Sequence, residues 1–543
     1  MLVRFPADFG LRVFFIAKQT MQIIKDKALL FTTRKAEQIT QVIPKSHVVE
    51  TRGDKSQLLV QWNLDTFRIL RNLGIKNVPH PIRRDYDWPG MYAPMAHQKV
   101  TAEGSAAYRR FYILNEMGTA KTISVAWAAD YLMNIGEVNK VLVLCPLSIM
   151  ESAWQSDLFK SVMHRKVGIA HGTRAVRQRV IHGDYDFVVM NHDGITLMAD
   201  EVKKAKFDLI IIDELNCFKT HNTNRSRALQ SVITPSTWVW GMTGSPAAQS
   251  PADAYGLAKI VRPDTVRMSY SRFRDEVMYK VTPFKWAPKA DAKQKVFALL
   301  QPAVRFTKAE CLDLPEQTFV DEYIPMSPQQ KKYYDTIRKA AVAEVAGSTI
   351  SAVNAGALAN KLAQISAGCV YINGETEGGA QGDYIMFDIT PRLNRLLDII
   401  EEAAHKVIVF APFKHIIAEL QGALLKKGVT SEVISGDVGR SKRTQIFEKF
   451  QTQEAPRVII IQPQAAAHGV TLTAADTVVW WGAVASTETY IQANARPHRA
   501  GQKNPVTVVH LYSSPAEKRI FSILKNNLNF HTSVVDMFSE IVA

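Results

Sequence analysis

The sequence is poor in cysteine and has no long hydrophobic run. Its four cysteines lie far apart and form no CxxC pair: Cys145, Cys217, Cys311 and Cys369. This spacing excludes a ribbon-type zinc site and favours a reducing compartment. The N-terminal stretch VFFIA is too short for a signal-peptide core, and no other stretch is long enough to cross a bilayer. We therefore expect an intracellular, cytoplasmic protein without a membrane partner.

Acidic residues are also scarce relative to basic ones. The 543 residues include 66 Lys and Arg against 51 Asp and Glu, a net charge of +15. This excess favours a polyanionic partner, with nucleic acid as the first candidate and an acidic membrane surface as the second. Charge alone does not decide between them. At ~150 residues per domain, the length predicts three or four domains.

What is present from about residue 89 onward is an alternation of apolar runs and helical patterns. One series of continuously apolar runs lies at 140–146, 186–191, 207–213 and 238–246. A second series lies at 406–412, 431–436, 457–463, 477–482 and 506–513. Such runs are typical of strands buried on both faces of a parallel sheet. The predicted fold class is α/β, with two doubly wound parallel-sheet lobes.

The same patterns give domain limits. We expect an N-terminal accessory domain at 1–88, a first lobe at 89–260, a mainly helical insertion or linker at 261–390, a second lobe at 391–515 and a helical tail at 516–543. The first 88 residues mix strand and helix patterns, which predicts a small α+β domain. They carry 15 Lys and Arg against 8 Asp and Glu, a balance of +7. We expect this domain to engage DNA, the alternative being a structural brace on the first lobe.

The stretch LNEMGTAKT (114–122) resembles half of a phosphate-binding loop. Gly118, Lys121 and Thr122 match the second half of the pattern Gly-x-x-x-x-Gly-Lys-Thr, whereas Asn115 and Ala120 replace its two glycines. Lysine reaches terminal phosphates, and a hydroxyl binds Mg²⁺. Alanine resists positive φ, so Ala120 fits this path only if its φ is negative. A plain loop before a helix remains the alternative.

Two acids follow an apolar strand in LIIIDELN. Asp213 at the carboxyl end of a strand can hold Mg²⁺, and the neighbouring Glu214 can position or deprotonate an attacking water. Near the end of the second lobe, QANARPHRAGQ (492–502) places Arg496 and Arg499 three residues apart, which predicts one side of a helix. Arginine suits the neutralisation of charge on a transferring phosphoryl group. Solvated side chains are the alternative in both cases.

Seven stretches in this order resemble the motifs of superfamily 2 helicases, specifically the Swi/Snf-like branch of DNA translocases. They are MAHQ, NEMGTAKT, DELN, MTGSP, VIVFAPFKH, HGVTLTAAD and QANARPHRAGQ, within about residues 91–515. The compact size, YDWPG and VMNHDG are most similar to the single-chain members found in bacteriophages. The resemblance implies two RecA-like lobes with helical insertions, ATP and Mg²⁺ as cofactors, and a monomeric motor on duplex, forked or branched DNA.

The resemblance also implies roles for individual residues. For the nucleotide, these are Gln98 at adenine, Gly118, Thr119, Ala120 and Lys121 at the phosphates, and Thr122 with Asp213 at Mg²⁺. For catalysis, they are Lys121, Asp213, Glu214, Gln492, Arg496 and Arg499. For coupling, they are Asn216, Thr243, Ser245, Gly469 and Thr471. For nucleic-acid backbone contacts, they are Ser148, Lys219, Lys414 and Ser435.

Three positions depart from the family pattern, namely Ala120, Asn216 and Ala495, where the family has glycine, histidine and glycine. We expect them to affect the rate of ATP hydrolysis and its coupling to lobe movement more than the fold. Asn216 can still form a hydrogen bond toward MTGSP. Two other functions stay open. One is an RNA helicase, and the other is a nucleic-acid-binding scaffold with weak or lost hydrolysis. The sequence does not decide whether strands are separated, in which direction the motor moves or which DNA structure it prefers.

Overall fold

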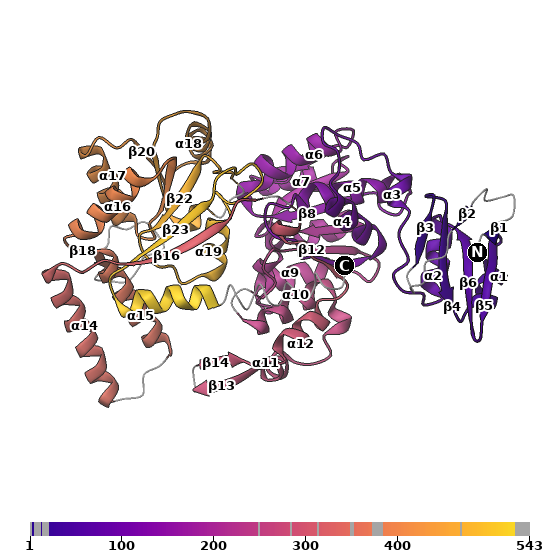
Figure 1. Ribbon diagram of the computed structural model, residues 1–543, viewed down its shortest axis with the longest axis horizontal. Coiled ribbons are helices and arrows are strands. Elements are labelled where there is room, and N and C mark those ends of the chain that lie inside the picture. Colours follow the sequence, from indigo (N-terminus) through magenta and orange to yellow (C-terminus); the bar gives the residue numbers. More distant parts are fainter. Residues whose placement is uncertain are drawn as a thin grey trace.

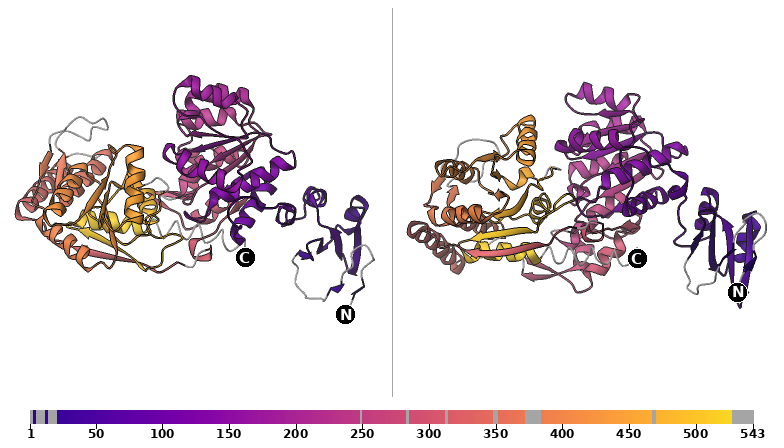
Figure 2. Two further views of the ribbon diagram at one scale, coloured as in Figure 1. Left: turned by 90° about the horizontal axis from the view of Figure 1, so that it is seen from above. Right: turned by 45° about the horizontal axis from the view of Figure 1, so that its top comes forward.

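The computed structural model describes residues 3–4, 12–13, 21–247, 250–282, 285–311, 314–347, 352–371, 384–466 and 470–526. Its three largest sheets define three bodies that lie in a row: a small N-terminal domain, lobe 1 and lobe 2 (Figures 1 and 2). Lobe 1 is built on a seven-stranded sheet and lobe 2 on a six-stranded sheet. The predicted fold class is confirmed.

The N-terminal domain is a four-stranded antiparallel sheet with two helices. The sheet has the order β3-β4-β6-β5, from β3 (Gln22–Ile24), β4 (Ala28–Thr33), β5 (Ser46–Arg52) and β6 (Lys55–Gln61). The helices are α1 (Ala36–Val42) and α2 (Leu64–Asn72), and the short strands β1 (Val3–Arg4) and β2 (Arg12–Val13) pair with each other. Alternate residues Leu29, Phe31 and Leu58 share one buried cluster, as period-2 strands require.

Lobe 1 has parallel strands in the order β15-β7-β12-β11-β8-β10-β9. They are β7 (Arg110–Ile113), β8 (Val141–Cys145), β9 (Val167–Ile169), β10 (Phe187–Asn191), β11 (Leu209–Ile212), β12 (Trp238–Met242) and β15 (Ala303–Val304). Its helices are α3 (Ile82–Asp85), α4 (Ala96–Ala107), α5 (Lys121–Asn134), α6 (Ser156–Ser161), α7 (Arg174–His182), α8 (Gly194–Ala205), α9 (Asn224–Val232) and α10 (Ala254–Val261). Val143 and Leu144 of β8 enter different core clusters, so both faces of the sheet are covered.

Lobe 2 has parallel strands in the order β16-β23-β22-β19-β21-β20. They are β16 (Gln317–Tyr323), β19 (Lys406–Phe410), β20 (Ser431–Ile434), β21 (Val458–Ile461), β22 (Ala475–Trp480) and β23 (Val506–Tyr512). Its helices are α16 (Thr390–Glu402), α17 (Lys414–Lys426), α18 (Arg440–Thr452) and α19 (Thr487–Asn494). A further helix covers 515–526, and the rest of the expected tail lies outside the described residues.

The region 261–390 mixes helices and strands. Its helices are α11 (Tyr270–Val277), α12 (Ala292–Leu299), α13 (Lys308–Cys311), α14 (Pro328–Gly347) and α15 (Ala352–Ala367). It also holds two antiparallel pairs, β13 (Met278–Thr282) with β14 (Lys285–Pro288) and β17 (Cys369–Tyr371) with β18 (Tyr384–Met386). In addition, it supplies β15 to lobe 1 and β16 to lobe 2, so it helps to build both sheets as well as connecting them.

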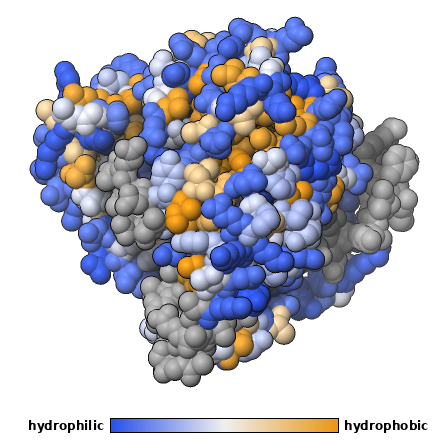
Figure 3. Space-filling view, turned by 90° about the vertical axis from the view of Figure 1, so that its left-hand side faces the viewer, coloured by the Kyte–Doolittle hydropathy of each residue, from blue (hydrophilic) through white to orange (hydrophobic). Residues whose placement is uncertain are grey.

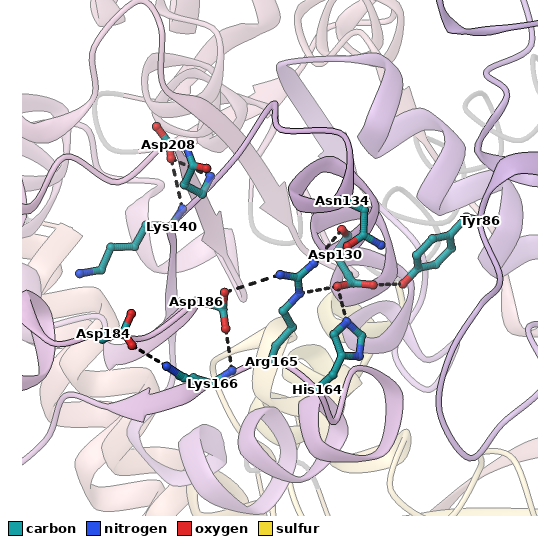
Figure 4. Close-up of polar contacts among 11 residues, drawn as sticks. Tyr86, Asp130, Asn134, Lys140, His164, Arg165, Lys166, Asp184, Asp186 and Asp208 are labelled. Atoms are coloured by element: carbon teal, nitrogen blue, oxygen red, sulfur yellow. Dashed lines mark hydrogen bonds and ion pairs between the residues drawn. The ribbon is translucent and has the colours of Figure 1, made fainter.

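A buried carboxylate fixes the linker between the N-terminal domain and lobe 1 (Figure 4). Asp130 on α5 is fully buried and accepts hydrogen bonds from the Tyr86 hydroxyl at 2.6 Å and from Arg165 Nε at 2.5 Å. His164 Nε2 lies 2.8 Å from the same carboxylate. A buried charge is tolerated when it is paired in this way. The linker is therefore held on the helix that begins at Lys121.

The outer end of lobe 2 is mainly hydrophilic, with apolar side chains scattered or in small groups (Figure 3). Leu425 of α17, for example, is 75% exposed. Isolated exposed apolar residues are normal for a protein surface. Within the described residues, no helix combines the length and apolar character needed to span a membrane.

Candidate active site

The loop between β7 and α5 wraps around the side chain of Lys121. Its Nζ donates to the carbonyl oxygens of Asn115 at 2.9 Å and Glu116 at 3.0 Å. Burial lowers the pKa of Lys121, and the nearby Glu214 and Asp213 carboxylates oppose this shift. The Thr119 hydroxyl closes the turn by donating to Glu116 O at 2.8 Å. A buried ammonium held by backbone carbonyls is positioned to exchange them for phosphate oxygens.

The backbone at Ala120 contradicts the sequence-based expectation. Ala120 has φ 53° and ψ 45°, in the left-handed region, so the expected negative φ is wrong. Gly118, with φ +87°, has the conformation that glycine tolerates. The loop thus keeps the path of a glycine-containing phosphate loop although alanine occupies the strained position, at a cost of roughly 1–2 kcal/mol.

The two acids lie at the carboxyl end of β11 close to Lys121, with Asp213 buried and Glu214 half-buried. Asp213 Oδ2 accepts from Trp154 Nε1 at 2.9 Å, and Oδ1 accepts from the Glu214 amide at 3.0 Å. Burial raises the pKa of Asp213, and Lys121 opposes this shift. Burial and then the Asp213 charge raise the pKa of Glu214 to about 7.

The chemistry of this donor set fits a magnesium–nucleotide complex. Within the described residues, Glu214 Oε2 is buried and has no hydrogen-bond partner. The same residues hold no cluster of three or more acidic, histidine or cysteine side chains suited to a metal. Mg²⁺ usually needs only one or two carboxylates, because substrate phosphates and water complete its shell. Asp213 and the Thr122 hydroxyl are the protein groups expected to hold it.

Gln98 lies at the start of α4, beside the phosphate loop. Its Oε1 accepts from the Met95 amide at 2.9 Å and caps the helix, and only 2% of the residue is exposed. The preceding His97 has Nε2 3.0 Å from Thr119 O, which ties the start of α4 to the loop. The position of the Gln98 side chain is therefore fixed, and its Oε1 already accepts a hydrogen bond within the protein.

The two arginines face lobe 1 from lobe 2, but they do not lie on a helix. Helix α19 ends at Asn494, and Arg496 and Arg499 lie in the turn that follows, so the predicted helical face is wrong. Burial and the neighbouring Arg499 lower the pKa of Arg496 to about 10, while Glu214 of lobe 1 opposes this shift. A Cβ added at Gly118 would lie 3.5 Å from Arg499 Cβ. The turn therefore reaches the phosphate loop.

Gln492 and Arg499 have partners within lobe 2. Gln492 is 7% exposed, and its Nε2 lies 3.4 Å from Glu488 Oε1. Arg499 Nη1 donates to Val470 O at 3.2 Å. Burial lowers the pKa of Arg499, and Asp157 of lobe 1 opposes this shift. The two hydrogen bonds fix Gln492 and Arg499 within lobe 2, and the Asp157 charge lies on the lobe 1 side of Arg499.

The residues assigned to coupling form a chain from the acids to the next strand. Asn216 Nδ2 donates to Ser245 O at 2.6 Å, and the Ser245 amide donates to Thr243 Oγ1 at 3.1 Å. The hydrogen bond anticipated for Asn216 is therefore present. Asn216 also bonds Glu488 of lobe 2 and lowers its pKa, which burial raises. Of the remaining pair, Thr471 is exposed and Gly469 lies outside the described residues.

The four residues assigned to backbone contacts lie at the carboxyl edges of the two sheets. Ser148 follows β8, Lys219 follows β11, Lys414 follows β19 and Ser435 follows β20. Lys414 pairs with Asp437 at 2.9 Å, and Ser435 O accepts from Arg443 Nη2 at 2.9 Å. Parallel strands bring Ser148 and Lys219 to the lobe 1 edge that carries the nucleotide loop, and Lys414 and Ser435 to the corresponding edge of the lobe 2 sheet. Their contact with a nucleic-acid backbone stays a prediction.

Sequence reasoning missed two groups that hold the acids in place. Trp154 and His192 both bind Asp213, the latter with Nε2 2.7 Å from the Asp213 carbonyl oxygen. Burial lowers the pKa of His192 to about 4, so the ring is neutral at neutral pH. His192 follows β10 within VMNHDG, and its position after a buried strand was the signal available. Trp154 offers no comparable signal, because it lies far from Asp213 in sequence.

Sequence reasoning also missed a link between the lobes. Glu116 of the phosphate loop accepts from Arg305 Nη2 at 3.1 Å and from the Lys308 amide at 2.8 Å. Lys308 Nζ donates to His498 O at 2.9 Å. The segment after β15 therefore connects the phosphate loop with the arginine turn. Glu116, Lys308 and His498 line a cavity of about 260 Å³ between the lobes, together with Gly244 and Tyr490.

Two family models match the chain. An SNF2-related domain matches residues 109–369, and a helicase conserved C-terminal domain matches residues 391–501. The first includes the phosphate loop and the acids, and the second includes the start of lobe 2 and both arginines.

Curated relatives match most of this chain. An uncharacterized ATP-dependent helicase of Mycoplasma genitalium is 25% identical over 76% of the chain and 39% of its own length. Chromodomain-helicase-DNA-binding protein 1-like of Mus musculus is 26% identical over 73% of the chain and 44% of its own length. The chain thus spans about two fifths of these relatives.

Among solved structures, the Sulfolobus solfataricus SWI2/SNF2 ATPase core in complex with dsDNA is similar. It is 21% identical and matches 83% of this chain and 96% of its own, with a TM-score of 0.40. The likeness to bacteriophage members stays a prediction.

Proposed function

This chain carries the two motor domains of an Snf2-like superfamily 2 helicase, and from this premise we propose that it is an ATP-driven motor on DNA. One observation carries the proposal. Lys121 of lobe 1 lies close to Asp213 and Glu214, and the Glu214 charge acts in turn on Arg496 of lobe 2, whose turn reaches Gly118 of the phosphate loop. A cationic group from a second lobe beside a phosphate loop is the arrangement that phosphoryl transfer requires.

In this proposal each group has a defined task. The Lys121 ammonium binds the terminal phosphates in place of its backbone carbonyls. When bound, Mg²⁺ neutralises phosphate charge, held on the protein side by Asp213 and Thr122. Glu214 directs its unpartnered Oε2 at the attacking water and accepts its proton. Arg496 and Arg499 stabilise the charge that develops on the transferred phosphoryl group.

The site also offers a route from hydrolysis to movement. Asn216 contacts both Ser245 in lobe 1 and Glu488 in lobe 2. The contact with Glu488 requires the two lobes to be closed on each other. We propose that loss of the phosphate releases the arginine turn and lets the lobes separate. We propose duplex, forked or branched DNA as the track, a monomeric motor and a cytoplasmic location, at the nucleoid or at sites of replication or recombination. The track follows from family likeness.

The deciding experiment measures ATPase rate with single-stranded, duplex, forked and four-way DNA and with RNA. Strong stimulation by duplex or branched DNA supports the proposal. Stimulation by RNA alone would identify an RNA helicase. ATP binding without turnover on every nucleic acid would identify a binding scaffold.

A further inference from the structure

A large basic cavity lies at the amino edge of the lobe 1 sheet, opposite the nucleotide site. Its volume is about 1020 Å³, and it is lined by residues that precede β7, β12 and β15. In a parallel sheet these strand starts share one edge, and the phosphate loop occupies the other. Strands of four to five residues separate the two edges by roughly 15 Å. The motor chemistry therefore does not use this cavity.

The charges in the cavity are strongly unbalanced. Four arginines and one aspartate line it, namely Arg71, Arg109, Arg110, Arg262 and Asp264. Asp264 is committed to Arg262, with Oδ2 2.8 Å from Nη2. Among the described residues, the other three arginines have no carboxylate partner within salt-bridge distance.

Each of those three arginines is nevertheless fixed. Arg110 Nη2 donates to Thr234 O at 2.7 Å, whereas its Nη1 is buried with no hydrogen-bond partner in the described part of the chain. Arg71 donates to Ala107 O and lies over the Tyr108 ring, 4.4 Å from its centroid. Arg109 lies over Trp238 at 5.5 Å. The cavity thus offers more cationic donors than the protein supplies acceptors.

Two separate bodies of the molecule build this wall. Arg71 belongs to α2 of the N-terminal domain, while Arg110 begins β7 of lobe 1 and Arg109 directly precedes it. A second cavity of about 430 Å³ shares Arg71 and Arg109 with the first and continues along α2 past Phe67 and Arg68. The basic surface therefore extends from lobe 1 onto the N-terminal domain, whose first 88 residues carry 15 basic against 8 acidic side chains.

We propose that this cavity binds consecutive phosphates of a DNA strand and so forms a second DNA site on the face of lobe 1 away from the nucleotide. Arginine forks match phosphate oxygens in pairs, and Tyr108 offers a flat ring beside them. The volume is at the upper limit for a small-molecule site, so it admits more than one isolated anion. This inference rests on the proposed function, because it takes DNA as the track.

The first test measures forked-DNA affinity by fluorescence anisotropy at several salt concentrations. Arg109→Gln/Arg110→Gln should weaken binding about tenfold or more and reduce the slope of log affinity against log salt by about 1.8, at ~0.9 for each lost phosphate contact. ATPase activity without DNA should not change, because neither residue touches the nucleotide site. Arg174→Gln/Arg179→Gln on α7, at the far side of the sheet, is the matched control of equal charge change. An equal loss of affinity and slope in both double variants would overturn the proposal.

The second test localises the contact by mapping phenylglyoxal modification of Arg109, an exposed residue, by peptide mass spectrometry. Forked DNA should protect Arg109 and leave Arg174 reactive. Protection by tripolyphosphate but not by DNA would overturn the DNA assignment in favour of a free polyphosphate ligand. Unprotected Arg109 in a protein whose ATPase is still stimulated by DNA would overturn this site alone. Absence of any DNA stimulation would instead overturn the proposed function.

Discussion

At the scale of single residues, two of the seven non-glycine residues with positive φ in the described part of the chain lie where the chemistry is expected. Ala120, with φ 53°, directly precedes Lys121, and Glu214, with φ 50°, lies close enough to act on the pKa of Lys121. Non-glycine residues seldom take this conformation, and such positions often occur in functional sites. The loop and the acids thus hold geometry that local preference alone would not give them.

Ala120→Gly should stabilise the protein, because glycine adopts φ 53° without strain. Relief of roughly 1–2 kcal/mol of strain outweighs the ~0.4–1 kcal/mol that glycine adds in unfolded-chain entropy, so the free energy of unfolding should rise by roughly 0.5–1 kcal/mol. ATPase activity should be kept or increased. Urea unfolding and ATPase assays measure both. Ala403→Gly, at φ −66°, is the control and should lose stability. A lower free energy of unfolding for Ala120→Gly than for the wild type would contradict the claim that Ala120 is strained.

Glu214→Gln should abolish hydrolysis while ATP binding persists. The glutamine keeps the size of the side chain but cannot accept the proton of water, so turnover should fall by several orders of magnitude. Lys121 and Asp213 remain to hold the nucleotide. Binding of a fluorescent ATP analogue and steady-state ATPase rates distinguish the two effects. Turnover near that of the wild type would remove Glu214 from the mechanism.

Arg499→Ala should reduce kcat much more than it changes ATP affinity. An arginine that acts only on the transferring phosphoryl group contributes roughly 10³–10⁵ in rate. Its main-chain partner Val470 lies in lobe 2, so the lobe should stay folded without it. Arg457→Ala is a matched control, since Arg457 also bonds lobe 2 carbonyls but directly precedes β21, at the opposite edge of the sheet. An unchanged kcat for Arg499→Ala would show that Arg499 has no catalytic role and is only a solvated side chain.

At the scale of elements, the linker joins the N-terminal domain to lobe 1 through an uncharged histidine. The His80 ring is 4.5 Å from Phe67 of α2 and 5.5 Å from Tyr131 of α5, centroid to centroid. Its Nδ1 accepts from the Ile82 amide at 3.2 Å, which requires an unprotonated nitrogen. Burial, Arg71 and Arg68 lower the pKa of His80 to about 3.

This histidine makes docking of the domain sensitive to acid. Between pH 6.5 and 3 the unfolded chain binds the proton that the folded chain excludes, so stability falls as pH falls through this window. From pH 7.5 to 5.5 the loss should be about 1.4 kcal/mol. His80→Asn keeps an acceptor for Ile82 but does not titrate. Urea unfolding at both pH values should show that the variant loses about 1.4 kcal/mol less than the wild type. Equal losses would contradict the assignment.

The elements also show where sequence patterns succeed. Strands β8, β10, β11 and β12 were predictable, because long β-branched runs buried on both faces leave a continuous apolar signal. Strand β15, with two residues, was not, since its place at the edge of lobe 1 depends on pairing with β7. The predicted domain limits at residues 260 and 390 also missed two strands. They did not anticipate that β15 belongs to the lobe 1 sheet and β16 to the lobe 2 sheet.

The site divides in the same way. Lys121, Asp213 and Glu214 were predictable, because each follows a strand within a short motif. Arg305 was not, because its hydrogen bond to Glu116 joins residues 189 apart in sequence. The φ of Ala120 was predicted wrongly, since residue preference was weighed without the loop geometry that the lysine imposes.

At the scale of the whole molecule, the two lobes are in contact through backbone and side chains. Lys308 bonds His498, and Arg499 lies against Gly118. The N-terminal domain makes its own contacts on lobe 1, away from this cleft, through Arg71 and His80. Nucleotide chemistry and the N-terminal domain should therefore be separable, provided that the linker remains in place.

The place of truncation decides whether that separation can be observed. Removing 1–78 should leave a folded protein with its DNA-independent ATPase, because every residue of the nucleotide site remains. It should bind forked DNA more weakly, with a shallower salt dependence, as basic side chains are lost. Equally tight binding with the same salt slope would make the domain a structural brace.

Removing 1–88 should be more harmful, because it also deletes Tyr86, which donates to the buried Asp130 at 2.6 Å. A buried carboxylate that loses a donor costs ~1–3 kcal/mol, so the longer truncation should melt several degrees below the shorter one. Tyr86→Phe in the full chain isolates this hydrogen bond and should lower the melting temperature without changing the salt dependence of DNA binding. If the two truncations melt together, Tyr86 does not support Asp130, and the linker serves only as a connection.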